Sequence, residues 1–358
     1  MLVGAVVVTF LVLTIVSLPI VFSLGIAGFT GLVVGNFSLQ KLPSSLVAGS
    51  QSWVLLAIPT FIFAGNLMER CGMSYALVDL ARAMIGWVRG GLGMSVVLAE
   101  YFFSGISGST IADVSAIGAM LTPPMLRAGY KPEHAASLVA SATAMGILVP
   151  PAIFMIVLGF YFGVFTATEA GALVAAYAVG AALLYYRNVT LREMVALIYE
   201  SALLTAAVVF LLAVASVYQF LMGMLGVPAM LGSMLQPLHS TPWLFMLAVS
   251  MIVILFGMVL EGLPAAVVLV PVVFPIAKQI GIHPIHFNIV LTAAVGIGLF
   301  LPPIGVGLLM ALRFANVSAG RHFKVYWPYL TALGVGLLLL IVFPEITLFL
   351  PRRAGLVR

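Results

Sequence analysis

Charged side chains and cysteines are scarce in this chain. Of its 358 residues only 7% are Asp, Glu, Lys or Arg, against about a quarter in a soluble domain. Cys71 is the single cysteine, which excludes a disulfide framework and a cysteine metal site. The chain also lacks the GxSxG, HExxH, phosphate-loop and CxxC patterns. With no nucleophile–base pair or metal-ligand set visible, the sequence predicts a protein that is not an enzyme and has no cofactor.

The residues that are abundant predict a membrane protein. Apolar residues make up 63% of the chain, and the mean hydropathy is +1.26. Apolar runs recur at 2–17, 200–217, 243–260 and 329–344, each close to the length that spans a bilayer. The first run is expected to be a span, because no Ala-x-Ala-like cleavage site follows it. The net charge of +5 is spread over loops, so it predicts membrane orientation rather than nucleic-acid binding.

One sequence pattern occurs twice. Gly146-Ile147-Leu148-Val149-Pro150-Pro151 returns 152 positions later as Gly298-Leu299-Phe300-Leu301-Pro302-Pro303. The same offset pairs Pro123 with Pro275, Gly129 with Gly281, Pro132 with Pro284 and His134 with His286. Two consecutive prolines break a helix, because proline lacks a backbone donor and clashes with the preceding turn. The repeat therefore predicts one structural unit built twice, each with a broken helix.

The first unit, residues 90–165, is predicted to begin with a re-entrant hairpin. Two apolar half-length segments lie between residues 90 and 127 and are separated by Ser104-Gly105-Ile106-Ser107-Gly108-Ser109-Thr110. Basic residues on both flanks place both ends of the pair on one side of the membrane. The tip offers hydroxyl oxygens suited to a hard cation. Alternatively, its small residues only let helices pack closely. A broken span from His134 to about Leu158 follows.

The second unit, residues 242–313, is predicted to be inverted relative to the first. Its hairpin comprises 242–260 and 263–279, with the tip at Leu260-Glu261-Gly262-Leu263-Pro264, and a broken span at about 286–312 follows. If the side holding Arg82 is cytoplasmic, ten Lys and Arg lie inside and five outside, in agreement with the positive-inside rule. Inverted repeats with broken helices at the midplane are typical of secondary transporters.

The remaining segments are predicted to form a scaffold. Residues 1–73 contain one long or kinked span at 2–35, a loop holding Lys41 and Pro43, and a second span from Trp53 to Met68. Residues 74–89 are amphipathic, which predicts either a helix in the headgroup plane or an ordinary solvated helix.

The C-terminal half completes this scaffold. In the connecting part, 166–241, the capping-box pattern Thr166–Glu169 starts a span, and 200–225 cross back. The C-terminal part, 314–358, holds a last span at about 327–350. The predicted fold class is an all-α polytopic membrane protein with inverted repeats, each a re-entrant hairpin plus a broken helix.

Polar side chains at membrane depth are the candidate functional residues, because burying a carboxylate there is costly. Asp113, one turn beyond the first tip, either binds an ion or only caps the tip. Glu261, at the second tip, is expected to bind the coupling ion. Asn66 either bonds a substrate or bridges two helices. His134 and His286 are expected at opposite membrane faces in helix-start or interfacial roles.

The complete candidate site for Na⁺ and substrate combines the tips, the acids and the helix breaks. It comprises Ser104, Gly105, Ser107, Gly108, Ser109, Thr110, Asp113, Gly146, Pro150, Pro151, Glu261, Gly262, Gly298, Pro302, Pro303 and Asn66.

At these positions the chain resembles the large membrane subunit of tripartite ATP-independent periplasmic (TRAP) transporters. The likeness covers nearly the whole chain. It is strongest at Phe103–Ser109 with Ala112-Asp113, at Pro150-Pro151, at Thr168-Glu169-Ala170 and at Gly281–Phe287 leading into Pro302-Pro303-Ile304-Gly305. The resemblance implies an elevator-type, Na⁺-coupled importer of organic acids such as C4-dicarboxylates or sialic acid, in a bacterial or archaeal inner membrane. It also implies a small four-helix membrane subunit and a periplasmic substrate-binding protein as partners, and Na⁺ sites at both hairpin tips.

Two features depart from that family. Glu261 stands where the family usually has Asp, and about two helices are missing where Phe154–Phe165 joins the first broken span to the Thr-Glu-Ala motif. Two other hypotheses therefore stay open. One is a non-transporting scaffold or assembly protein of the same fold, and the other is a Na⁺/anion symporter that needs no binding protein.

Overall fold

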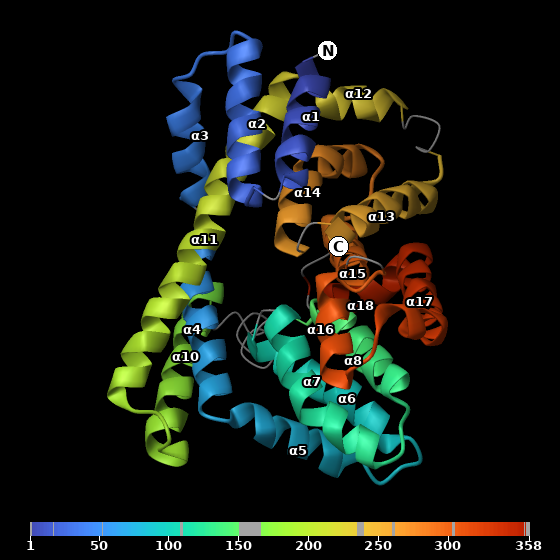
Figure 1. Cartoon of the computed structure of the whole chain (residues 1–358). Coiled ribbons are helices and arrows are strands. Elements are labelled where there is room, and N and C mark those ends of the chain that lie inside the picture. The colour runs from blue at the N-terminus through green and yellow to red at the C-terminus, as the bar shows by residue number, and fades with distance from the viewer. Residues whose placement is uncertain are drawn as a thin grey trace.

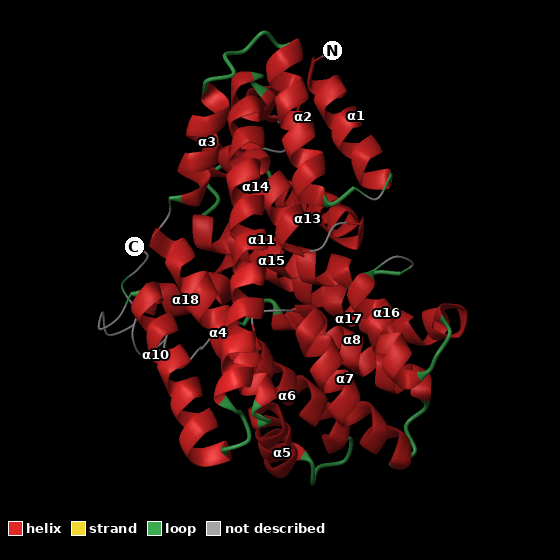
Figure 2. Ribbon diagram, turned by 60° about the vertical axis from the view of Figure 1, so that its left-hand side comes forward, coloured by secondary structure: helices red, strands yellow, loops and turns green. Residues whose placement is uncertain are grey.

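The computed structural model describes residues 2–16, 18–51, 53–107, 110–149, 166–234, 240–259, 262–302, 305–353 and 355. Throughout these residues the secondary structure is helical, and no strand occurs in them (Figures 1 and 2). Three of the described helices are long and apolar enough to cross a membrane, at Thr168–Tyr186, Leu191–Met224 and Gly320–Val342.

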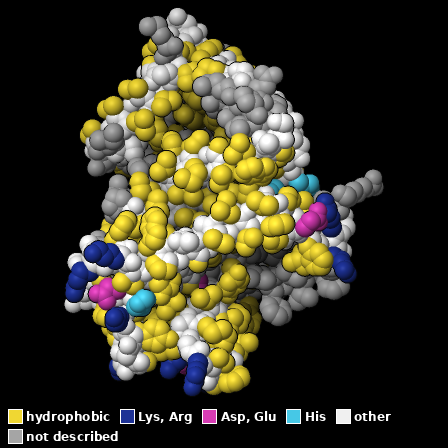
Figure 3. Space-filling view, turned by 90° about the vertical axis from the view of Figure 1, so that its right-hand side faces the viewer, with side chains coloured by type: hydrophobic (Ala, Val, Ile, Leu, Met, Phe, Trp, Pro, Cys, Tyr) yellow, Lys and Arg dark blue, Asp and Glu magenta, His cyan; other side chains and the backbone are white. Residues whose placement is uncertain are grey.

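The outer surface is rich in large apolar side chains. Leu184 and Tyr185 are 74% and 81% exposed, and Leu338 is exposed as well. Figure 3 shows hydrophobic side chains across much of one face, with Lys and Arg gathered near its lower edge and at one side. Extended apolar patches of this kind are rare on soluble monomers, so this surface suits contact with lipid.

The N-terminal segment forms two short helices rather than a span. α1 (Leu2–Ile15) and α2 (Ile20–Val34) pack side by side, as Figure 2 shows. The prediction of one long or kinked span over 2–35 is therefore wrong. The chain turns at Pro19, whose missing N–H prevents one helix from running through. With about 1.5 Å of rise per residue, neither helix reaches across a hydrocarbon core of about 30 Å.

The predicted loop around Lys41 is also a helix. α3 (Lys41–Ser50) tolerates Pro43 because Pro43 lies in its first turn, where backbone N–H groups have no helical partner. α3 packs against the C-terminal half of α11 (Leu191–Met224), where Ser216 Oγ donates to the carbonyl of Ser45. The segment from Trp53 to Met68 is helical, with a short 3₁₀ turn, η1 (Trp53–Leu56), followed by α4 (Ala57–Arg70). That it spans the membrane stays a prediction.

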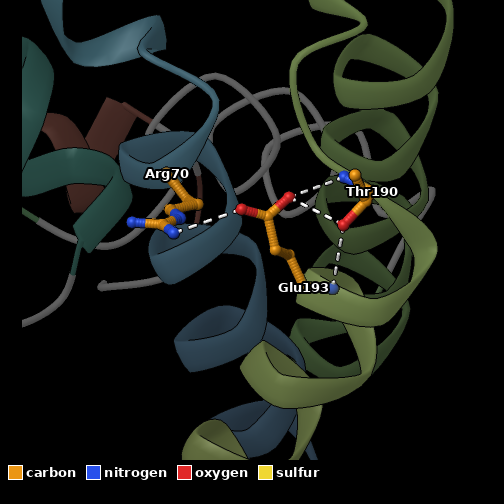
Figure 4. Close-up of polar contacts among 3 residues, drawn as sticks. All are labelled: Arg70, Thr190 and Glu193. Atoms are coloured by element: carbon orange, nitrogen blue, oxygen red, sulfur yellow. Dashed lines mark hydrogen bonds and ion pairs between the residues drawn. The ribbon is translucent and has the colours of Figure 1, made fainter.

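Two capping boxes start the helices of the connecting part. α10 (Ala167–Gly180) continues into a π-helical turn, η2 (Ala181–Tyr186). The predicted box is confirmed: Thr166 N donates to Glu169 Oε2 at 2.6 Å, and Glu169 N donates to Thr166 Oγ1 at 3.3 Å. Thr190 and Glu193 form a second box at the start of α11, and Glu193 also pairs with Arg70 at 3.2 Å (Figure 4). The sequence Thr190–Glu193 carries the same Thr-x-x-Glu pattern, which predicts this second box as well.

The amphipathic segment is a helix, α5 (Met73–Ile85), as predicted within 74–89. Val78 and Ala81 face the core, and Tyr75 and Met84 are exposed.

The repeat predicted from glycines and prolines is visible in the helices themselves. The first unit contains α6 (Gly91–Ser107), α7 (Thr110–Arg127) and α8 (Pro132–Gly146). The second contains α13 (Pro242–Val259), α14 (Gly262–Gln279) and α15 (Pro284–Leu299). α7 and α14 begin and end 152 positions apart. Gly129 and Gly281 have matching positive φ angles of 88° and 84°, which glycine adopts without strain.

The rest of the C-terminal half differs from the predicted last span. α12 (Val227–Met234) precedes the second unit, and α16 (Val306–Ala315) follows the break after α15. α17 (Ala319–Val342) starts earlier than the predicted 327–350 and ends before Pro344. α18 (Pro344–Arg353) is a separate helix that packs against α15 and α17. A last helix long and apolar enough to span is thus present at Gly320–Val342. Its predicted end at about residue 350 is wrong, because Pro344 cannot continue the hydrogen-bonding pattern of α17.

Buried side chains divide the described residues into one large and two smaller cores. The large core joins the hairpins, the broken helices and α17. One smaller core packs α1 and α2 on α11. The other packs α4 and α10 against the start of α11. The two repeats thus share a large core, and the second hairpin also joins the α11 core through Ala265 of α14.

Candidate functional site

α8 and α15, the helices that precede the two Pro-Pro pairs, touch each other near their C-terminal ends. Ala144 of α8 and Gly296 of α15 are repeat partners, and a Cβ added to Gly296 would lie 2.0 Å from the carbonyl oxygen of Ala144. A side chain at position 296 would therefore force the helices apart. This contact places the ends of both helices next to each other at the middle of the repeat core.

The glycine of each break packs against the first helix of its own hairpin. A Cβ on Gly298 would lie 2.5 Å from the carbonyl oxygen of Ile254 in α13. A Cβ on Gly146 would instead lie 2.3 Å from Glu100 Oε1 and 2.9 Å from Ser104 Oγ, both in α6. Gly146 is thus required for close packing against polar side chains.

Four polar side chains from three helices gather at this point. Glu100 and Ser104 come from α6, Asp113 from the first turn of α7 and Thr143 from α8. Glu100 and Asp113 are each 1% exposed, and Ser104 and Thr143 are also buried. We refer to Glu100, Ser104, Asp113 and Thr143 as the acidic cluster.

Hydrogen bonding within the acidic cluster leaves one carboxyl oxygen of Glu100 without a partner among the described residues. Thr143 Oγ1 donates to the carbonyl oxygen of Val139 at 2.9 Å and to Glu100 Oε2 at 3.3 Å. Since a hydroxyl has one hydrogen, these two acceptors share it. The side chain of Asp113 is a hydrogen-bond partner of Glu100. Glu100 Oε1 has no partner among the described residues, although it is fully buried.

Glu100 is a member of this site that the sequence interpretation missed. It is the single acid in the apolar run from Leu92 to Phe103. The rule that selected Asp113, a carboxylate at membrane depth, applies equally to Glu100 and could have found it.

The candidate residues are only partly brought together. Ser104, Asp113 and Gly146 meet around Glu100, and Gly105 is buried beside Ser104. Ser107 ends α6, Thr110 starts α7, Gly262 starts α14 and Pro302 lies in the break after α15. Gly108, Ser109, Pro150, Pro151, Glu261 and Pro303 lie outside the described residues. Na⁺ binding at the two tips stays a prediction.

Asn66 lies at a different place. Its Nδ2 donates to Ser201 Oγ of α11 at 3.0 Å, which is the helix-bridging alternative. It also lines a cavity of about 1000 Å³ between α4, α5 and α11, together with Glu69 and Glu200. No described hairpin residue lines that cavity.

The two histidines of the repeat, His134 and His286, lie near the starts of their helices and each contacts a hydroxyl group. His134 is exposed near the start of α8, with Nδ1 3.1 Å from the hydroxyl of Tyr329. His286 is buried near the start of α15, with Nδ1 2.9 Å from Thr347 Oγ1 of α18. The described part of the chain contains no group of three or more His, Cys, Asp and Glu that could hold a metal ion. An ion bound by the described residues would therefore need hydroxyl or backbone oxygens among its ligands, in addition to any carboxylate.

A family model described as "Tripartite ATP-independent periplasmic transporter, DctM component" matches residues 7–161 and 152–346. The chain belongs to this family. Both repeats fall within the matched residues. The match comes in two segments that overlap at 152–161, where the predicted deletion lies.

Several curated permeases are similar over nearly their whole length. The 2,3-diketo-L-gulonate TRAP transporter large permease protein YiaN of Escherichia coli is 30% identical, with 92% of this chain and 94% of that protein covered. The C4-dicarboxylate TRAP transporter large permease protein DctM of Pseudomonas aeruginosa is 29% identical, covering 93% and 95%. The sialic acid TRAP transporter large permease protein SiaM of Vibrio cholerae is 24% identical, covering 94% and 95%.

The similar permeases also show how this chain differs in length and which class of protein it resembles. The alignment with the Pseudomonas permease runs over 404 positions, more than the 358 residues present here, so that protein has positions with no counterpart in this chain. The relatives are transporter permease subunits rather than enzymes. Family membership and the apolar helices together indicate a multi-pass membrane protein.

Proposed function

We propose that the chain is the large permease subunit of a Na⁺-coupled TRAP transporter that imports an organic acid across the inner membrane of a bacterium or archaeon. The observation that carries the proposal is the family match across both repeats. C4-dicarboxylates and sialic acids are the substrate classes to test first, because the names of similar permeases specify them.

The helix ends around the breaks suit an anionic substrate. α7, α14 and α16 start at Thr110, Gly262 and Val306, next to the hairpin tips and the second break. A helix N-terminus presents unpaired N–H groups and partial positive charge. Three helix N-termini near the meeting point of α8 and α15 therefore favour binding of the carboxylate of an organic acid. Hydroxyl and carbonyl oxygens nearby can coordinate Na⁺.

The division of the cores supports an elevator movement. The large core of the repeats is a separate cluster from the cores around α11, although the second hairpin also contacts α11 through Ala265 of α14. In an elevator movement this α11–α14 contact is the one that has to slide. In this proposal the re-entrant hairpins belong to the moving part. A small four-helix membrane subunit braces the part around α11, and a periplasmic binding protein delivers the substrate. Na⁺ is the coupling ion, and no other cofactor takes part.

Reconstitution into proteoliposomes tests the proposal. The chain, its small membrane subunit and its binding protein are combined with a radiolabelled C4-dicarboxylate or sialic acid. We expect uptake when an inward Na⁺ gradient is imposed and none when choline replaces Na⁺. Asp79→Asn, an exposed carboxyl on α5, is the control and should transport like the unmodified chain.

The other outcomes separate the remaining hypotheses. A stable complex with the small subunit but no Na⁺-dependent uptake of any organic acid would favour a scaffold protein. Uptake without the binding protein would favour an independent Na⁺/anion symporter. Either result would contradict the proposed function.

A further inference from the structure

Glu100, at the centre of the acidic cluster, has few hydrogen-bond donors. The hydroxyl hydrogen of Thr143 is shared between the carbonyl of Val139 at 2.9 Å and Glu100 Oε2 at 3.3 Å. No Lys, Arg or His side chain takes part in the interactions of Glu100, whose partners are Asp113 and Thr143. Burying a carboxylate without donors or a cation is strongly unfavourable. Glu100 therefore has no positive partner among the described side chains.

The position of Glu100 Oε1 indicates where a cation would bind. Glu100 Oε1 is buried, has no hydrogen-bond partner among the described residues and lies against the backbone of Gly146. Ser104 Oγ faces the same point on α8, because both atoms approach the position that a Cβ of Gly146 would occupy. Carboxylate and hydroxyl oxygens that converge in this way are the ligands that hard cations prefer.

The second repeat shows that the fold does not need these polar groups. At the offset of 152 positions, Asp113 and Thr143 correspond to Ala265 and Val295, which are buried. Glu100 and Ser104 correspond to Ile252, which is 46% exposed, and to the half-buried Phe256, so the like-for-like comparison is the one at Asp113 and Thr143. The same helices form with apolar residues at all four positions. A purely structural role for the acidic cluster is thus not imposed by the repeat.

We infer that Glu100, Asp113, Thr143 and Ser104 form a Na⁺ site between α6, α7 and α8, on the α6 side of the hairpin tip and sharing Ser104 with it. Glu100 lies seven residues before Ser107, or about 10 Å along a helix, so it is too far away to ligate an ion at the tip itself. The inference rests on the proposed Na⁺ coupling and adds Glu100 as a direct ligand. Na⁺ at this site takes the place of the proton that the hydrogen bond between Glu100 and Asp113 requires, and it ties the hairpin to α8.

Thermal unfolding at graded Na⁺ concentrations tests the site. The purified full chain in detergent, with its small subunit where the two co-purify, is titrated with NaCl, and choline chloride keeps the ionic strength constant. We expect Na⁺ to raise the Tm, since a ligand that binds only the folded state stabilises it. The variants are Glu100→Gln and the volume-matched Thr143→Val, with Asp79→Asn as the exposed-carboxyl control.

The signs of the two Tm effects distinguish ligation from a structural role. Glu100→Gln should keep or raise the Tm without Na⁺, because it removes a buried charge. It should also raise the Na⁺ concentration for half-maximal stabilisation by about tenfold or more, as expected for a lost charged ligand. Thr143→Val should weaken the Na⁺ response less, and Asp79→Asn should match the unmodified chain.

Three results would overturn the inference. One is an unchanged Na⁺ response in both Glu100→Gln and Thr143→Val. Another is a lower Na⁺-free Tm in Glu100→Gln with an unchanged Na⁺ response, which indicates a structural role. The third is a Tm of the unmodified chain that depends on pH and not on Na⁺, which indicates a proton instead. Na⁺-dependent uptake with an unaffected Glu100→Gln variant refutes only the site, whereas Na⁺ binding without uptake refutes only the proposed transport.

Discussion

The first and second repeats share a backbone plan but differ in what they bury. α7 and α14 match in length and boundaries, and the glycines after them adopt the same left-handed conformation. Where the first repeat buries Asp113 and Thr143, the second buries Ala265 and Val295. The second repeat keeps its acid, Glu261, at the tip instead. Glycine and proline positions thus set the fold of the unit, and the polar side chains are free to differ for function.

The contact between the repeats offers the largest test of this comparison. In Gly296→Val the side chain would meet the carbonyl oxygen of Ala144, since even a Cβ would lie 2.0 Å from it. We expect a loss of about 3 kcal/mol or more in stability, because overpacking against backbone cannot relax by a rotamer change. Thermal unfolding of the purified protein measures the loss.

A glycine in open surroundings provides the matched control. Gly223 of α11 has no atom within 4 Å of an added Cβ, so Gly223→Val should change stability by about 0.5 kcal/mol or less. Equal effects at positions 296 and 223 would show that the broken helices do not touch.

Converting the first repeat to the residues of the second is the next test. The double variant Asp113→Ala with Thr143→Val places the residues of positions 265 and 295 in the first repeat. We expect it to fold and to assemble, but to lose Na⁺-driven uptake by about a hundredfold, since two ligands at about 1.4 kcal/mol each are removed. Uptake in proteoliposomes, normalised to the amount of folded protein, checks this. Transport at the normal rate would contradict a functional role for the acidic cluster.

Changes at the tips sharpen the comparison further. Glu261→Gln should raise the Na⁺ concentration for half-maximal uptake by about tenfold, because it removes the charge of the tip acid. Ser107→Ala at the end of α6 should have a smaller effect in the same direction. Unchanged Na⁺ dependence in both variants would refute Na⁺ sites at the tips.

The histidine partners should give the smallest effects. His286 is buried and bonded to Thr347, whereas His134 is exposed beside Tyr329. His286→Phe should cost about 1 to 2 kcal/mol by leaving the Thr347 hydroxyl without that partner. His134→Phe should change stability by about 0.5 kcal/mol or less. Thermal unfolding of both variants tests the difference, and a larger loss at position 134 would contradict it.

The sequence predicted the repeat well because glycine and proline restrict the backbone locally. The second hairpin was expected at 242–260 and 263–279, and the helices are Pro242–Val259 and Gly262–Gln279. The Thr166–Glu169 capping box was equally local and is confirmed. Features of this kind depend on residues close together in the chain.

Features that depend on distant contacts were not predictable in this way. Hydropathy is the same for one span and for two short helices that fold back, so α1 and α2 were joined into one. The polar residues of α3 suggested a loop, but α3 is held by packing on α11, where a Cβ on Gly49 would lie 2.6 Å from Ser216 Oγ. Glu100 is one acid in an apolar run, and only the packing of α6 against α7 and α8 brings it to Asp113 and Thr143.

The most direct test is a pair of density maps of the assembled transporter, one in NaCl and one in choline chloride. The account predicts a Na⁺-dependent peak between Glu100, Asp113 and Thr143 in the first repeat. It predicts no peak at Ala265 or Val295, the buried counterparts of Asp113 and Thr143 in the second repeat. Absence of a peak at the acidic cluster in NaCl, with clear density for its side chains, would contradict the account.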